Sequence, residues 1–156
     1  MVYFNMIYSS KKLFLVALFP FFTIAFSEEC DPGFIWIEDV PVCCGGAHNC
    51  FYEADLAVLQ LMIDNSTSTI NMLLDDNEDG IMHPVELGYT EWVNGRLVAL
   101  DCFLSDIMPC NLSGPLPENI GDLEYLEALW LNGNQLTGEI PESMGNLSNL
   151  ELLYLS

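Results

Sequence analysis

The chain repeats itself at a fixed spacing. Residues 112–123 match residues 136–147, a shift of 136 − 112 = 24 positions. The leucines that follow recur at the same shift. The first set is Leu123, Leu126, Leu129 and Leu131, and the second set is Leu147, Leu150, Leu153 and Leu155. A repeat unit of this length buries its apolar face only against its neighbours, and stacks of such units usually display a binding surface.

The repeat unit reads LxxLxxLxLxxNxLxGxIPxxxG and resembles the plant-type leucine-rich repeat over residues 99–156. Leu129 and Leu131 alternate as in a short strand with inward side chains, so Trp130 points outward. Asn134 follows this strand, where its amide can pair with backbone groups of the turn. The resemblance implies a solenoid of short parallel strands that begins near residue 99.

The first and last units depart from this pattern. Ala99, Cys102, Ser105 and Ile107 occupy leucine positions in the first coil, which is therefore expected to be a transition from an N-terminal cap. Residues 150–156 begin a further unit that stops before its Asn. Because such stacks need about three or more units, we expect the repeats to be truncated C-terminally, as in a fragment of a longer protein.

Residues 1–27 have the layout of a secretory signal peptide. Lys11 and Lys12 precede an apolar run, and small residues at positions 25 and 27 predict cleavage after Ser27. An uncleaved or lipidated membrane anchor is the alternative, although the run, which contains Pro20, is shorter than the roughly 20 residues that span a bilayer. We expect a secreted or cell-surface protein without a membrane-spanning segment in the mature chain.

The mature chain is strongly acidic. Without residues 1–27, Arg96 is the only strong base against 23 Asp and Glu residues, which gives a net charge of 1 − 23 = −22. Such a surface repels phosphate backbones, so nucleic acid is excluded as a partner.

Six cysteines follow the predicted signal peptide, four of them in a cysteine-rich segment over residues 28–53. An even count in an exported chain predicts disulfides, and Cys102 with Cys110 is a plausible local pair. A metal cluster is the alternative for Cys43, Cys44, His48 and Cys50, although adjacent cysteines make zinc geometry awkward.

Residues 75–86 resemble the EF-hand calcium loop, D-x-[DN]-x-[DN]-G-x5-E. The resemblance implies that Ca²⁺ is bound by oxygens of Asp75, Asn77, Asp79, Ile81 and Glu86, with the sharp turn at Gly80. The alternative is a solvated acidic turn that binds nothing.

A helical region over residues 54–98 is expected to frame this loop. Residues 54–63 favour a helix, residues 70–74 a short entering turn, and apolar residues at helical spacing over 85–97 an exiting helix. The predicted fold class is therefore α+β: a helical, EF-hand-like and cysteine-rich cap, followed by the start of a leucine-rich repeat solenoid. Calcium would order the cap, and Trp92 and Leu97 would cover the first coil.

The expected function is recognition rather than catalysis. Trp130 and Tyr154 occupy equivalent positions and would form an aromatic stripe on the concave face that binds a protein or glycan, unless they only pack on each other. His48 and His83 are the only histidines, and no catalytic pair stands out, so an enzyme is not expected. Two alternatives are an acidic matrix or adhesion component crosslinked by calcium and a non-catalytic part of a larger enzyme.

Overall fold

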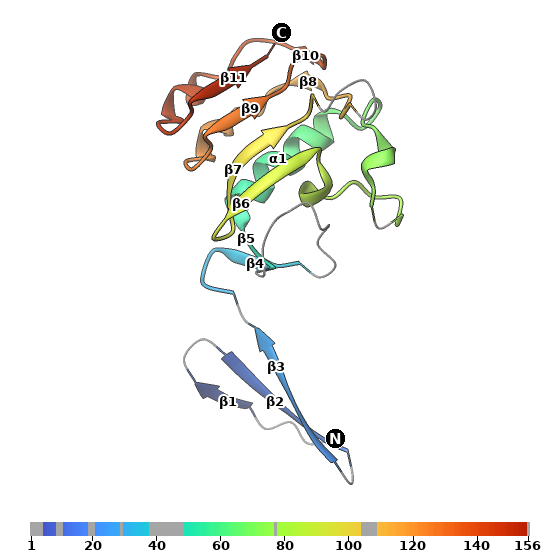
Figure 1. Cartoon of the computed structure of the whole chain (residues 1–156), viewed down its shortest axis with the longest axis vertical. Coiled ribbons are helices and arrows are strands. Elements are labelled where there is room, and N and C mark those ends of the chain that lie inside the picture. Colours follow the sequence, from blue (N-terminus) through green and yellow to red (C-terminus); the bar gives the residue numbers. More distant parts are fainter. Residues whose placement is uncertain are drawn as a thin grey trace.

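The computed structural model describes residues 5–8, 11–18, 21–28, 30–37, 49–76, 78–103 and 109–155. Its first three strands, β1 (Asn5–Tyr8), β2 (Lys11–Leu18) and β3 (Phe21–Glu28), form an antiparallel sheet that lies apart from the other elements (Figure 1). The predicted signal peptide falls on these strands. None of the helices in the described ranges has the length and apolar character needed to cross a bilayer.

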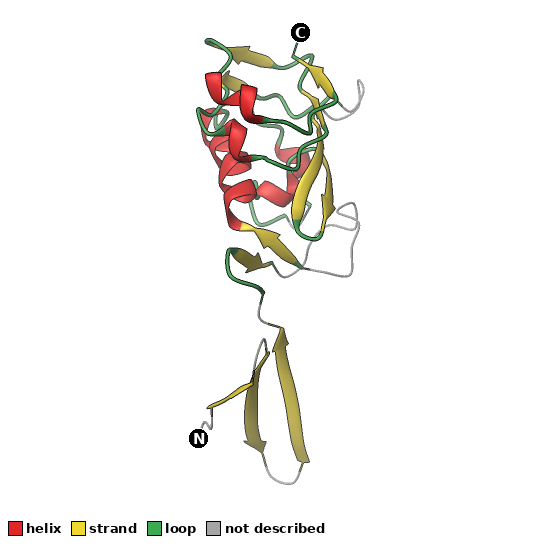
Figure 2. Cartoon of the chain, turned by 90° about the vertical axis from the view of Figure 1, so that its left-hand side faces the viewer, coloured by secondary structure: helices red, strands yellow, loops and turns green. Residues whose placement is uncertain are grey.

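A four-stranded sheet backed by one helix forms the body of the protein. The sheet has the order β11-β9-β7-β6. Its strands are β6 (Tyr89–Val93), β7 (Arg96–Asp101), β9 (Ala128–Trp130) and β11 (Leu152–Tyr154). The β6–β7 pair is antiparallel, whereas β7, β9 and β11 run parallel. Figures 1 and 2 show helix α1 (Glu53–Asn65) on one side of this sheet.

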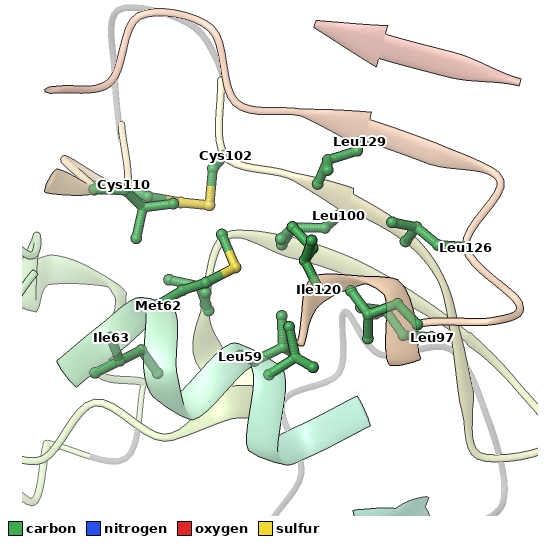
Figure 3. Packing of buried hydrophobic residues seen from close by; sticks show 14 of the residues in the cluster. Leu59, Met62, Ile63, Leu97, Leu100, Cys102, Cys110, Ile120, Leu126 and Leu129 are labelled. Carbon is green, nitrogen blue, oxygen red and sulfur yellow. A yellow bond between two sulfur atoms is a disulfide. The ribbon is translucent and has the colours of Figure 1, made fainter. Parts of the chain in front are cut away.

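The hydrophobic core lies between α1 and the sheet. Figure 3 shows Leu59 of α1 close to Leu97 and Leu100 of β7, with Leu129 of β9 above them. All four side chains are completely buried. Burial of a leucine contributes about 1.5–3 kcal/mol relative to exposure, so these contacts hold the helix and the sheet together in one unit.

Smaller elements complete the fold. An antiparallel pair, β4 (Phe34–Trp36) and β5 (Cys50–Tyr52), precedes α1. A parallel pair, β8 (Ser113–Pro115) and β10 (Gln135–Thr137), joins the two repeat units. Four short 3-10 helices lie in the described ranges: Met72–Leu74, Pro84–Glu86, Ile120–Asp122 and Glu142–Asn146.

The predicted fold class is wrong. The described residues form a small mixed α+β fold with one α-helix and several small sheets, and no solenoid is detected among them. The expected exiting helix is instead the β6–β7 hairpin, because Asn94 and Gly95 take positive φ angles of 51° and 74° that suit a two-residue hairpin turn. Strand β7 then pairs with β9, so residues 54–98 and the repeat units share one sheet and one core.

Other local predictions are confirmed. Helix α1 covers the expected residues 54–63, and a 3-10 helix lies within the expected entering turn at residues 70–74. Asn134 pairs with the backbone as predicted, since its Oδ1 accepts from the Leu112 N–H at 2.8 Å and its Nδ2 donates to the Leu131 carbonyl at 2.9 Å.

The repeat spacing holds for one strand pair and fails for the next. Leu129 of β9 pairs with Leu153 of β11, 153 − 129 = 24 residues later. On its other side Leu129 pairs with Leu100, which lies 129 − 100 = 29 residues earlier, so the 24-residue register does not extend to β7. Ser105 and Ile107, which the sequence places at leucine positions, lie outside the described ranges. The first coil is thus five residues longer than the repeat.

Candidate functional site

The face of the four-stranded sheet that points away from α1 carries two rows of side chains; we call it the outward face. The strand register defines both rows. The first row is Glu91, Ala99, Ala128 and Leu152. The second row is Tyr89, Asp101, Trp130 and Tyr154. The structure therefore places the predicted partner-binding residues, Trp130 and Tyr154, in directly paired positions.

The second row presents aromatic rings to solvent. Tyr154 is 50% exposed and Tyr89 is 44% exposed, while Trp130 is half-buried. In the described part of the chain the ring contacts join Phe34 to Tyr52 and Phe51 to Trp92, and none joins Trp130 to Tyr154. The rings of the second row are therefore not occupied by stacking on each other.

A groove of about 570 Å³ opens on the outward face. Its floor includes Ala99 and Ala128, whose small side chains leave space between larger neighbours. Trp130 borders the floor at the C-terminal end of β9, and Tyr125 precedes the same strand. This volume lies within the range of about 300–1,000 Å³ that is typical of ligand sites.

Arg96 is fixed at the edge of this groove. Its Nε and Nη2 donate to the two oxygens of Asp55 at 2.9 and 3.1 Å, and the same carboxylate accepts from the Leu97 N–H at 2.9 Å. Its guanidinium lies 4.0 Å from the ring centroid of Tyr52 and 4.3 Å from that of Tyr125. Burial by itself lowers the pKa of Arg96, but the hydrogen bonds and charge of Asp55 outweigh it and raise the pKa above the ordinary value.

The groove has a surplus of negative charge. The positive charge of Arg96 is matched by Asp55, which is completely buried. Glu91 and Glu127 also line the groove, and both are exposed. Neither carboxylate has an ion-pair partner among the described side chains. The groove therefore offers two unmatched carboxylates beside an aromatic ring.

The acidic loop is the second candidate site. Its sharp turn lies where the sequence predicts, because Gly80 has φ +83° and its N–H donates to Asp75 Oδ2 at 2.8 Å. The Ile81 N–H donates to Asp79 Oδ1 at 2.7 Å. Glu86 is buried, and its Oε2 accepts from the His83 N–H at 2.9 Å at the start of the 3-10 helix.

The loop residues carry the oxygen donors that calcium requires, but those of their side chains that the structure describes are not gathered around one point. Carboxylate oxygens are the donors that Ca²⁺ prefers, and Asp75 Oδ1 is buried without a hydrogen-bond partner. However, no group of three His, Cys, Asp or Glu side chains that could hold a metal is assembled within the described ranges. Asn77, one of the predicted ligands, lies outside those ranges.

The cysteine predictions are confirmed in part. Cys102 forms a disulfide with Cys110, and Cys50 forms one with Cys30. Cys50 is therefore not available for the alternative metal cluster, and Cys43, Cys44 and His48 lie outside the described residues. Two disulfides, together with the absence of a spanning helix from the described ranges, are compatible with an extracellular protein.

Sequence reasoning missed the groove itself. Tyr52 and Asp55, which lie where β5 continues into α1, meet the distant Tyr125 at Arg96. The available signal was that Arg96 is the only strong base after residue 27, which makes a specific partner for it worth seeking. No family model, curated protein or solved structure matches the chain in the comparisons made.

Proposed function

We propose that the protein is a secreted or cell-surface recognition module that binds a protein partner through its outward face. The observation that carries this proposal is the row of aromatic rings beside the 570 Å³ groove, with Tyr89 and Tyr154 exposed and Trp130 half-buried. Trp and Tyr provide much of the binding energy at protein interfaces.

Strand geometry supports recognition at this face. The core-facing side chains of β7 and β9 are completely buried at Leu97, Leu100 and Leu129. The strands therefore form a rigid support, and Trp130 is held by a backbone whose position is set by the core. A preorganised surface loses less conformational entropy when a partner binds.

The test is a selection of random peptides displayed on phage against the immobilised protein. Binders are then compared on the Trp130→Ala and Tyr154→Ala variants, with Leu73→Ala as the control, because Leu73 is 75% exposed and lies outside the sheet. We expect binding to be lost on Trp130→Ala and kept on Leu73→Ala, with unchanged far-ultraviolet spectra. Selected peptides that bind Trp130→Ala as well as the natural protein would contradict the proposal.

We also propose that Ca²⁺ binds the acidic loop through Asp75, Asn77, Asp79, the Ile81 carbonyl and Glu86. The unpartnered Asp75 Oδ1 and the turn at Gly80 support this site. A ligand present at a hundredfold above its dissociation constant stabilises the folded state by about 2.7 kcal/mol.

Calorimetry with calcium and with a chelator tests the ion. We expect a higher melting temperature with calcium, and loss of this difference in Asp75→Asn. Asp76→Asn is the matched control, because Asp76 is the neighbouring carboxylate and occupies no ligand position of the motif. Equal melting temperatures with and without calcium would refute the site.

A further inference from the structure

We propose that the groove on the outward face receives an arginine or lysine side chain from a basic peptide segment of the partner. This inference rests on the proposed recognition function and names the chemistry of its ligand. Three observations carry it: the unmatched carboxylates of the groove, the internal neutralisation of Arg96, and the free ring of Trp130.

Charge is the first argument. Glu91 pairs with Ala99 in the first row, so its carboxylate lies beside the alanine floor. Glu127 lines the same groove and immediately precedes β9. Two carboxylates without ion-pair partners attract a cation, and the chain as a whole carries a net charge of −20, which adds a long-range attraction for basic partners.

The state of Arg96 is the second argument. An anionic ligand would need a free positive charge in the groove, and Arg96 is the only strong base in its lining. Its guanidinium already makes two hydrogen bonds to Asp55 and is stacked on two tyrosine rings. Recruiting it for a ligand would leave the buried Asp55 carboxylate unpaired, which is costly. The groove is therefore built to select against anions.

The aromatic wall is the third argument. The faces of Tyr52 and Tyr125 are used by Arg96, whereas Trp130 has no cation or ring against it in the described structure. Among the aromatic residues, tryptophan attracts a cation placed over its ring face most strongly. Asp101, the neighbour of Trp130 in the second row, adds a carboxylate on the same side.

The probe for this site is a peptide of alternating glycine and arginine, eight residues long, with its ends blocked. The matched peptide has citrulline at each arginine position, which keeps the shape of the side chain and removes the charge. Isothermal titration at low salt measures both. We expect the arginine peptide to bind and the citrulline peptide to bind at least about tenfold more weakly, because the charge attraction to each carboxylate is lost.

Variants locate the binding in the groove. Glu91→Gln with Glu127→Gln is expected to raise the dissociation constant of the arginine peptide about tenfold. The control, Glu118→Gln with Glu142→Gln, removes the same number of exposed charges near the 3-10 helices and should change it less than about twofold. Equal losses in the two double variants would show nonspecific attraction to an acidic surface and overturn the proposal.

The outcomes separate this inference from the recognition function. Peptides that depend on Trp130 but bind equally with citrulline would leave the recognition face intact and show that the groove takes a neutral ligand. Binding of the arginine peptide that survives Trp130→Ala would place the cation elsewhere. Either result would overturn the inference, whereas only the absence of Trp130-dependent peptides in the selection would overturn the recognition function itself.

Discussion

Replacing Asp55 by Asn tests the reasoning about the groove most directly. Asp55 is completely buried, and the Arg96 side chain is 12% exposed. The substitution keeps the size of the side chain but removes the negative charge, so Arg96 is left in a poorly solvated position without its counter-ion. Breaking a buried pair in this way costs about 3–5 kcal/mol. The loss is large against a total stability of about 5–15 kcal/mol for an ordinary domain.

Urea denaturation of Asp55→Asn measures this loss, with the Asp64→Asn variant as the control. Asp64 lies on the same helix, is exposed, and accepts a hydrogen bond from Gln60 four residues away. We expect a change below about 0.5 kcal/mol for the control. A loss of less than about 1 kcal/mol in Asp55→Asn would refute the view that the pair is desolvated.

A double variant separates the charge from the packing. Arg96→Met in the Asp55→Asn background removes the unpaired cation and keeps an apolar side chain between the two tyrosine rings. Replacing both members of a buried pair is often neutral, so we expect the double variant to be more stable than Asp55→Asn alone. A further loss instead would mean that the stacking of Arg96, rather than its pairing, holds α1 to the hairpin.

Effects are expected for three further variants and for the removal of calcium. Gly121→Ala should cost about 1–3 kcal/mol in thermal unfolding, because a Cβ there would clash with the Ser143 carbonyl oxygen. Gly145→Ala, one repeat later, meets no atom within 4 Å and should be nearly neutral. Replacing Cys102 and Cys110 by Ser should cost about 2.5 kcal/mol through loop entropy, since the disulfide spans 8 residues; equal denaturation midpoints would contradict this. The melting temperature should fall when calcium is chelated.

The sequence period predicted the part of the fold that depends on neighbouring units. The pairing of Trp130 with Tyr154 follows from a spacing of 24 residues, because equivalent strands of consecutive units pair in register. Asn134 was likewise predictable, since its role is to bond the turn next to its own strand. A repeat spacing and a side chain that bonds its own turn can both be recognised in the amino-acid sequence.

The β6–β7 hairpin was missed because two patterns competed. Apolar residues over 85–97 fit helical spacing, but Trp92 and Leu97 are buried as cross-strand partners in the hairpin. The decisive signal was the Asn94–Gly95 pair, which favours a two-residue hairpin turn more strongly than the spacing favours a helix. Because of this turn, part of the predicted helical cap belongs to the four-stranded sheet, and the predicted fold class is therefore wrong.

The groove could not be predicted from the repeat, because most of it lies outside the repeat. Asp55 and Arg96 are separated by 41 positions, and no periodicity links them. Their pairing fixes α1 against the hairpin. The hairpin places Glu91 beside the groove floor that Trp130 borders. A partner that contacts Trp130 therefore also meets residues from the hairpin. It follows that specificity at this face depends on the non-repetitive part of the chain, so a change such as Asp55→Asn should weaken recognition even though Asp55 itself is completely buried and out of a ligand's reach.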